Sequence, residues 1–422
     1  MKSQTLHGWV AASLALLALP TSQAFGAVAP QGHELQVNSR TDFRQQNPVA
    51  EFAPSGRALV AWENDQMGLR GQFLNADGTP SGAELTLAAN DPWSGGSEEQ
   101  KLGTRREPSL TFLAGGGFLL AWTEGLEDVQ SSPFIETRTV LSQNVFLQRF
   151  DSSGNPVGSR LRVNSPTAAF QHSPQLIPRG KGDLLVTWQS DDGGIFVRTV
   201  SGATGALTGN QVRINDANAG AHPVGAASNL GTELVAWEAS DGTDVGIFAR
   251  IVDPAGQGIG PVFRVNSTIK GRQRRPAVAS ASDGSYMVAW EGDLADGRQT
   301  RIFAQAVGSR GGLVGPQLTL AKGVGYDVAQ IAPALAPAPG GHYLLSWLGW
   351  LSDGSPAFGM FAVEIDVLGN MVGAPAWITE HRVQNNFRRT SIGANGTGSY
   401  LLSWESYANG AQVIDARRLG AN

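Results

Sequence analysis

Residues 284–291 read GSYMVAWE, which is a glycine followed by a short apolar run that ends in a tryptophan. The same arrangement occurs seven times, with 49 to 66 residues between successive tryptophans: Trp62, Trp122, Trp188, Trp237, Trp290, Trp347 and Trp404. A period of this length is too long for a helical solenoid unit and is typical of a four-stranded blade. The repeat therefore predicts an all-β chain that forms a seven-bladed β-propeller, with four antiparallel strands in each blade.

Each repeat contains four apolar runs, which in the fifth copy are residues 276–279, 286–291, 301–307 and 316–320. The second and third runs are apolar on consecutive residues, as strands covered on both faces are. Blades stacked around a ring have both faces covered. We therefore expect the seven tryptophans to pack between blades, and a row of sugar-stacking platforms is the less favoured alternative.

The two ends of the chain are predicted to share one blade. Six tryptophan strands are followed by both a third and a fourth run, but the seventh is followed only by residues 413–418. A matching run, residues 34–38, stands near the N-terminus. Pairing it with 413–418 would close the ring and remove exposed strand edges. Loss of residues 30–40 should then destabilise the whole ring.

The N-terminal region predicts export. Lys2 precedes a largely apolar run over 9–19, Pro20 breaks that run, and Ser22 and Ala24 suit the −3 and −1 positions of a cleavage site. We expect a signal peptide over 1–24, a short N-terminal segment over 25–32 and a single propeller domain over 33–422. A membrane anchor is the alternative, although the run is short for one. The predicted location is secreted or periplasmic.

The amino-acid composition argues against several classes of binding partner and site. The 422 residues carry a net charge of −5, so no global basic footprint favours nucleic acid. With no cysteine, disulfides, thiolate metal sites and lipoprotein acylation are excluded. No later segment is long and apolar enough to span a bilayer. We expect a monomer with a glycan or an envelope or extracellular protein as its partner.

The repeat pattern resembles a family. Gln-x-x-Pro, then Gly-x-x-Leu-Val-x-Trp, a glycine-rich turn and finally Val-Asn is similar to the propeller-type repeats of bacterial exported and cell-surface proteins. The resemblance covers residues 33–418 and implies architecture rather than activity. Four repeats keep the glutamine, and three depart from it: Gln45, Gln171, Gln273 and Gln330 against Arg105, Gly220 and Arg388.

One face of the ring is the expected place for a ligand. In a propeller the fourth-to-first and second-to-third connections emerge on the same face, and here they are the longer ones. Two long loops, residues 88–107 with Trp93 and residues 124–143, should rise over the second blade. They are interpreted either as a functional cap or as neutral insertions.

Charged side chains gather at that face. Cations precede the first run of five repeats: Arg105, Arg106, His172, His222, Arg274, Arg275, Arg388 and Arg389. Carboxylates follow four of the tryptophans: Glu63, Glu238, Glu291 and Glu405. The two sets either form ion pairs between neighbouring blades or leave a ring of cations that receives an anionic ligand. Together with Trp93 they are the candidate ligand-binding residues.

Motifs for metal binding and catalysis are weak or missing. Ser240-Asp241-Gly242-Thr243-Asp244 offers oxygens to Ca²⁺, but hairpin turn chemistry explains it better, so we expect no cofactor. Gly-x-Ser-x-Gly and His-Glu-x-x-His are both absent.

The leading hypothesis is thus an exported, non-catalytic propeller that acts as a binding or scaffold module through its loop-rich face. The alternative is a polysaccharide hydrolase or lyase that uses Asp or Glu near the central channel. A purely structural ring is the third possibility.

Overall fold

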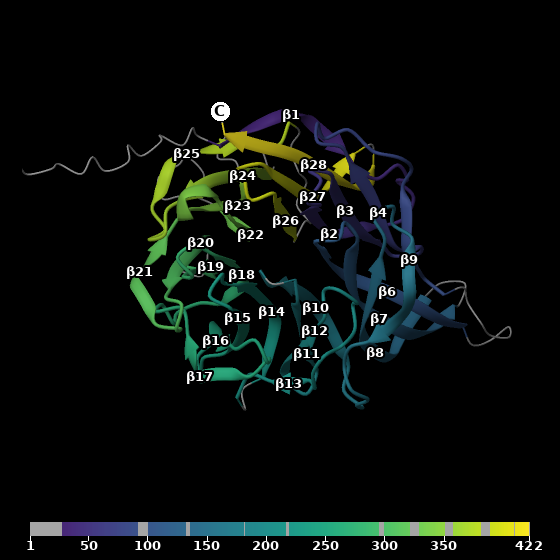
Figure 1. Ribbon diagram of the computed structural model, residues 1–422, viewed down its shortest axis with the longest axis horizontal. Coiled ribbons are helices and arrows are strands. Elements are labelled where there is room, and N and C mark those ends of the chain that lie inside the picture. Colours follow the sequence, from purple (N-terminus) through teal and green to yellow (C-terminus); the bar gives the residue numbers. More distant parts are fainter. Residues whose placement is uncertain are drawn as a thin grey trace, which may run out of the picture.

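Seven four-stranded antiparallel sheets form a ring in the computed structural model, so the predicted seven-bladed β-propeller is confirmed (Figure 1). The structure describes residues 28–91, 100–131, 136–180, 182–216, 219–294, 299–320, 329–350, 358–380, 389–408 and 410–421. Within these residues the only helix is the short 3₁₀ turn Pro339–Gly341. The expected signal peptide lies outside them, as do Trp93 and Arg388.

The strands of each blade run outward from the axis. The innermost strands are β2 (Gln45–Phe52), β6 (Gln100–Phe112), β10 (Gln171–Pro178), β14 (Gly220–Ala227), β18 (Gln273–Ser280), β22 (Gln330–Pro337) and β26 (Thr390–Ala394). The second strands, which carry the tryptophans, are β3 (Ala58–Asn64), β7 (Phe118–Ser131), β11 (Leu184–Ser190), β15 (Glu233–Ser240), β19 (Tyr286–Asp293), β23 (Tyr343–Trp350) and β27 (Tyr400–Ala408).

The outer half of each blade holds two more strands. The third strands are β4 (Gly68–Leu74), β8 (Glu136–Phe150), β12 (Ile195–Val200), β16 (Val245–Val252), β20 (Thr300–Val307), β24 (Phe358–Ile365) and β28 (Ala411–Ala421). The outermost are β5 (Leu85–Ala89), β9 (Pro156–Arg162), β13 (Val212–Arg213), β17 (Gly258–Arg264), β21 (Leu313–Thr319), β25 (Met371–Trp377) and β1 (Val28–Gln36). We number the blades 1 to 7 from β2–β5 to β26–β28 with β1.

The predicted closure of the ring is confirmed. β1 pairs antiparallel with β28, with Leu35 opposite Ala416, and these two strands from opposite ends of the described chain lie side by side (Figure 1). The pairing continues beyond β1, since the N–H of Val37 donates to the carbonyl of Ile414 at 2.7 Å. β1 starts at Val28, so it includes part of the segment expected before the domain.

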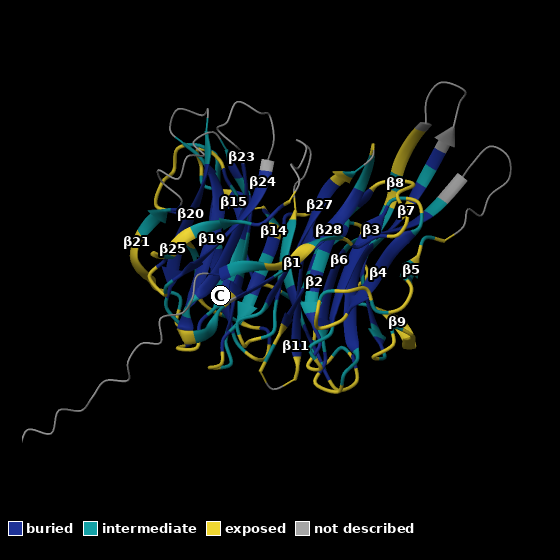
Figure 2. Cartoon of the chain, turned by 90° about the horizontal axis from the view of Figure 1, so that it is seen from above, coloured by how far each residue is buried: buried dark blue, intermediate teal, exposed yellow. Residues whose placement is uncertain are grey.

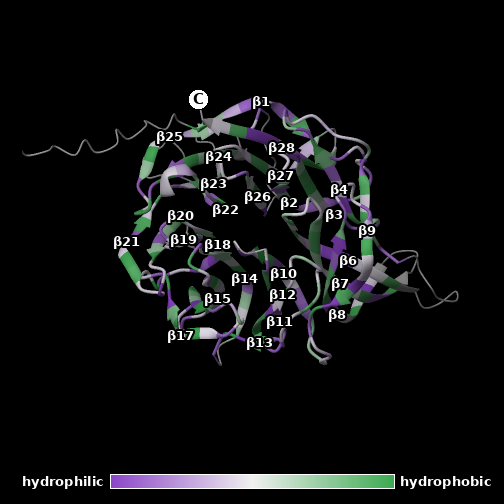
Figure 3. Ribbon diagram, in the orientation of Figure 1, coloured by the Kyte–Doolittle hydropathy of each residue, from purple (hydrophilic) through white to green (hydrophobic). Residues whose placement is uncertain are grey.

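The repeat tryptophans pack between blades, as predicted. All seven are buried, and hydrophobic segments follow the strands all around the ring (Figure 3). The repeat glutamine has a definite role here, because it accepts the indole N–H in three blades: Trp62 to Gln45 at 2.7 Å, Trp188 to Gln171 at 2.9 Å and Trp290 to Gln273 at 2.7 Å. A buried indole donor would otherwise be left without a partner.

Six innermost strands carry the same β-bulge. The residue before the repeat proline has a positive φ of 50 to 55° in each: Asn47, Glu107, Ser173, His222, Arg275 and Ala332. The register of each strand against its neighbour shifts at this point. A positive φ is uncommon outside glycine and must be stabilised by its surroundings. Its repetition turns one backbone N–H per blade toward the preceding blade.

The long loops expected over blade 2 are mostly strand. β6, β7 and β8 extend well past the ring and project from it, with Lys101 paired to Asp128 and Glu127 to Val140 (Figure 2). The expectation of loops over 88–107 and 124–143 was therefore wrong for most of those residues. The polar composition of these residues had indicated loops, but alternate residues such as Val129 and Glu127 are buried in the extension.

Candidate functional site

A cavity of about 1650 Å³ occupies the axis of the ring. Its walls come from the innermost strands of all seven blades, and deeper down they are largely apolar, as at Val49, Leu110 and Val278. Charged residues line its mouth: Arg44, His222, Glu238, Arg274, Arg275, Arg389 and Glu405. A concave, partly apolar space with a few convergent polar groups is the usual form of a ligand site.

The glutamates that follow the tryptophans link neighbouring blades. Each accepts the N–H of the positive-φ residue of the next blade: Glu405 from Asn47 at 2.8 Å, Glu63 from Glu107 at 3.2 Å, Glu238 from Arg275 at 2.8 Å and Glu291 from Ala332 at 3.0 Å. Where the glutamate is absent, another side chain takes its place: Glu107 accepts from Ser173 at 2.7 Å and Gln189 from His222 at 2.6 Å.

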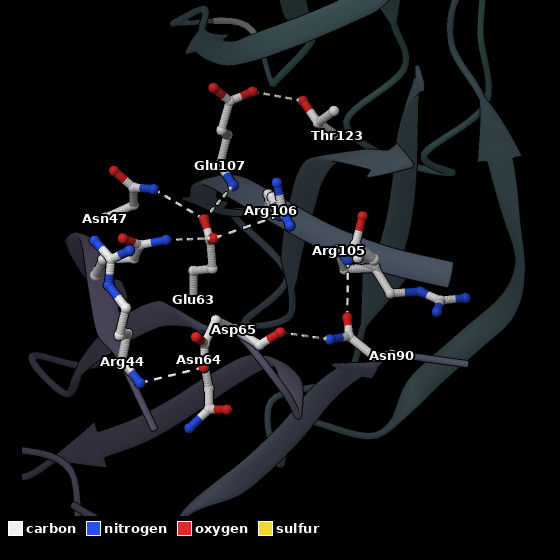
Figure 4. Close-up of polar contacts among 12 residues, drawn as sticks. Arg44, Asn47, Glu63, Asn64, Asp65, Asn90, Arg105, Arg106, Glu107 and Thr123 are labelled. Carbon is white, nitrogen blue, oxygen red and sulfur yellow. Dashed lines mark hydrogen bonds and ion pairs between the residues drawn. The ribbon is translucent and has the colours of Figure 1, made fainter. Parts of the chain in front are cut away.

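Glu63 shows how completely such a carboxylate is satisfied (Figure 4). Besides the N–H of Glu107, it accepts hydrogen bonds from Gln46 at 2.7 Å and Asn47 at 2.8 Å, and Arg106 lies 3.9 Å away. Burial nevertheless raises the pKa of Glu63 above its ordinary value. Because Glu63 is buried and does not line the cavity, its role is to join blades 1 and 2.

Arg105 and Arg106 of blade 2 are both engaged by nearby carboxylates. Arg105 is buried and forms ion pairs with Asp91 at 2.8 Å and Glu124 at 3.4 Å. Arg106 pairs with Glu127 at 2.8 Å. Neither guanidinium lines the axial cavity.

The cations of blades 3 to 5 also pair within their own blades. His172 lies 2.8 Å from Asp191, and His222 lies 3.2 Å from Glu238. Arg275 approaches both oxygens of Glu291 at 2.8 Å, and Arg274 lies 3.5 Å from the same residue.

Ion pairs between neighbouring blades were one of the two interpretations of these cations. Two of the predicted cations form ion pairs with a carboxylate of another blade, both long: Arg106 with Glu63 at 3.9 Å and Arg389 with Glu107 at 4.0 Å. The shorter links to the predicted glutamates come from backbone N–H donors at 2.8 to 3.2 Å.

Two cations at the mouth remain largely unengaged. Arg389 has one ion pair among the described residues, with Glu107 at 4.0 Å. Arg44 directly precedes the repeat Gln45, and its guanidinium forms no ion pair within the described part of the chain. Sequence reasoning missed Arg44, because it belongs to a polar connection rather than to the repeat position where the other cations stand.

Two exposed aromatic side chains flank these cations. Phe43 is 52% exposed and Tyr407 is 47% exposed, and both line the cavity together with Gln412. Exposed large aromatic rings at a cavity mouth are typical of binding surfaces. We call Phe43, Arg44, Arg389, Glu405, Tyr407 and Gln412 the seam cluster, since it lies where blade 7 meets blade 1. The sequence did offer a signal for Phe43, since it is the one aromatic residue in the otherwise polar run 40–44.

Of the four predicted glutamates, Glu405 alone has both a raised pKa, which Glu63 shares, and a place in the cavity lining, which Glu238 shares. Burial raises its pKa above the ordinary value, although the N–H of Asn47 and the positive charge of Arg389 act in the opposite direction. It also lines the cavity. Deeper in the channel, burial raises the pKa of Glu51 to about 8.

Other predicted features are less informative. Asp241 accepts the N–H groups of Thr243 and Asp244 at 3.0 and 2.9 Å, as in an ordinary turn. Among the described residues no three His, Asp or Glu side chains gather as metal ligands. The expectation of no cofactor stays an untested prediction. In the same part of the chain no helix has the length and apolar character needed to cross a membrane.

Comparisons with known proteins extend the fold assignment. No family model and no curated protein matches the sequence. Among solved structures, the chain is similar to a protein of unknown function from Dyadobacter fermentans, with a TM-score of 0.54, 12% identity and coverage of 94% of this chain and 99% of that one. It is also similar to an ulvan lyase of a polysaccharide lyase family bound to -[GlcA(1-4)Rha3S]-, with a TM-score of 0.56, 10% identity and coverage of 92% and 96%.

A third similar structure is an α-L-arabinanase from Penicillium chrysogenum, with a TM-score of 0.45, 13% identity and coverage of 92% and 99%. Identities this low establish only the shared propeller fold. The ulvan lyase is by its name an enzyme that acts on a polysaccharide. A shared fold at this identity neither supports nor contradicts the hypothesis of a non-catalytic module.

Proposed function

We propose that this protein binds an anionic polysaccharide at the mouth of its axial channel, through the seam cluster. The observation that carries the proposal is the pair Arg44 and Arg389. Both residues line the cavity, and the other described mouth cations are already held by carboxylates within their own blades. A cation left without a close partner is the group most available to a ligand.

The chemistry of the cluster fits a sugar polymer that carries carboxylates or sulfates. Guanidinium groups form bidentate contacts with such anions, and this geometry selects planar or tetrahedral oxyanions over neutral hydroxyls. The rings of Phe43 and Tyr407 offer apolar faces on which sugar rings can stack. One solved propeller of similar fold is bound to a polymer of glucuronate and sulfated rhamnose, which lends the proposal general support.

Export and a monomeric state complete the proposal. The predicted signal peptide would deliver the protein to the periplasm or the exterior, where such polysaccharides occur. The outermost strands of the blades have nine residues at most, and short edges of this kind do not need a second copy to protect them.

Calorimetric titration of the purified protein would test the proposal, with polyglucuronate, polygalacturonate, a sulfated rhamnoglucuronan and neutral arabinan as ligands. We expect binding to an anionic polymer that weakens as salt rises, and none to arabinan. Arg44→Gln with Arg389→Gln should weaken binding by about 10- to 100-fold, from the typical contribution of hydrogen bonds to charged groups.

Arg310→Gln is the matched control. Arg310 is an exposed arginine in the turn between β20 and β21, and it does not line the cavity. The control should bind as the parent protein does. Binding that is equal for arabinan and polyuronates, or that survives loss of both seam arginines, would overturn the proposal.

Cleavage of the bound polymer is the second candidate function. Glu405 favours it, because a carboxyl group with a raised pKa at a cavity mouth is suited to proton transfer.

A further inference from the structure

We propose that the seam cluster cleaves a 4-linked uronate polymer by elimination, with Glu405 accepting the proton and Tyr407 donating one. This inference rests on the proposed binding of an anionic polysaccharide. It adds a reaction, a substrate class and a role for each residue.

The first support is the placement of Glu405 and Tyr407. They stand two residues apart on β27, and alternate residues of a strand share a face. Both line the axial cavity. Ser406, between them, points the other way and hydrogen bonds with Asp415 of the same blade. A carboxylate and a phenol are thus presented side by side toward one space.

The second support is the way in which Glu405 is held. Its Oε1 accepts the N–H of Asn47 at 2.8 Å, which fixes the side chain. Its Oε2 accepts no hydrogen bond from any residue that the structure describes. One oxygen therefore orients the group and the other remains available to take a proton. The raised pKa of Glu405 agrees with this, because it makes the carboxylate a stronger base.

The third support is the positive charge beside it. Arg389 and Arg44 both act electrostatically on Glu405, and both line the cavity. A uronate carboxylate held between the two guanidiniums would have its negative charge neutralised. Neutralisation acidifies the C5–H bond next to that carboxylate, which is the difficulty that any such elimination must overcome.

The step balances without water, oxidant or metal. Oε2 of Glu405 takes the C5 proton, and the electron pair of the C5–H bond forms the C4=C5 double bond. The C4–O bond to the neighbouring sugar breaks, and its oxygen receives the proton of the Tyr407 hydroxyl. Proton exchange with solvent then restores both side chains. The products are an unsaturated uronate end and a new hydroxyl end.

The protein would be incubated with polyglucuronate or polygalacturonate. The ultraviolet absorbance of the conjugated double bond and the release of reducing ends would be followed together. We expect both signals to rise together. Glu405→Gln keeps an oxygen for the Asn47 N–H and should lower the rate by at least about 100-fold, while affinity changes little. Tyr407→Phe keeps the aromatic ring and removes only the hydroxyl. It should slow the reaction without affecting folding, because Tyr407 lies at the exposed rim of the cavity.

Glu291→Gln is the control for the structural task of Glu405. Glu291 also accepts an inter-blade N–H, but it is buried and away from the cavity. This variant should keep the parent rate. Reducing ends without absorbance would indicate hydrolysis and overturn the inference, as would binding without cleavage. Both results would leave the proposed binding function standing, whereas absence of binding to every anionic polymer would overturn that function itself.

Discussion

Two junctions of the ring do the same structural task with different electrostatics. Between blades 4 and 5, Glu238 accepts the N–H of Arg275 at 2.8 Å, and between blades 7 and 1, Glu405 accepts the N–H of Asn47 at the same distance. Burial pushes the pKa of Glu238 upward, but His222 and Arg275 outweigh it, so its pKa lies below the ordinary value. For Glu405 burial prevails and the pKa is raised.

The difference arises from what surrounds each carboxylate. Glu238 has His222 beside it at 3.2 Å, whereas Glu405 has guanidiniums near enough to act electrostatically but forms no ion pair with any residue that the structure describes. In a repeat protein, one copy of a carboxylate can have all its polar partners while the equivalent carboxylate of another blade lacks some of them. The incompletely paired copy is then the better candidate for a functional role. A shared repeat position can thus be purely structural in one blade and available for chemistry in another.

Blade 7 is also the blade in which the N-terminal strand β1 pairs with the C-terminal strand β28. Deleting residues 28–38 is the most severe test of how much the ring depends on that pairing. The deletion removes β1 and exposes the edge of β28, together with the core around Val37. We expect loss of reversible folding or a destabilisation of several kcal/mol, because a whole strand is lost. Thermal melting and gel filtration would measure it. A deletion variant that melts like the parent would show that blade 7 does not need its fourth strand.

The architecture could be predicted because seven tryptophan strands and one displaced N-terminal run admit few arrangements. The site could not be predicted to the same depth. Arg389 and Glu405 were identified from their repeat positions, but Arg44, Phe43 and Tyr407 lie in connections or at a strand end, where no periodicity marks them. Nor does the sequence reveal which cations are already paired, since that depends on bulges that turn backbone N–H groups toward glutamates.

Glu51 gives the next largest effect. It lies in the channel on blade 1, where the corresponding residues of blades 4 and 5 are Ala226 and Ala279. Burial raises its pKa from 4.5 to about 8, so the folded state binds its proton more tightly than the unfolded state. The free energy of unfolding should then fall as the pH rises between those two values.

Glu51→Gln should remove this fall and stabilise the protein at pH 8 by a few kcal/mol, from about 1.4 kcal/mol per unit of pKa. Urea denaturation at several pH values would measure it, and parallel curves for parent and variant would contradict it.

Truncating the two junction glutamates sharpens the comparison directly. Either Glu238→Ala or Glu405→Ala leaves a backbone N–H of the next blade without its acceptor, at a cost of about 1–3 kcal/mol. Glu238→Ala should cost more, because it also removes the partner of His222. Urea denaturation at neutral pH compares the two variants. A larger loss for Glu405→Ala would mean that the seam carboxylate is the more structural of the pair.

The smallest expected effect is on the pH dependence of stability. Its sign should differ between Glu238→Gln and Glu405→Gln, which separates the two junctions most cleanly. A carboxyl with a lowered pKa adds stability above its unfolded value of 4.5 and loses it as the pH falls through the folded value. Glu238→Gln should therefore destabilise the protein at neutral pH and matter less in acid. A carboxyl with a raised pKa does the reverse, so Glu405→Gln should become relatively more stable as the pH rises above 4.5. If both variants gave slopes of the same sign, Glu405 would be held as Glu238 is, and the argument that it is available to act as a base would fail with it.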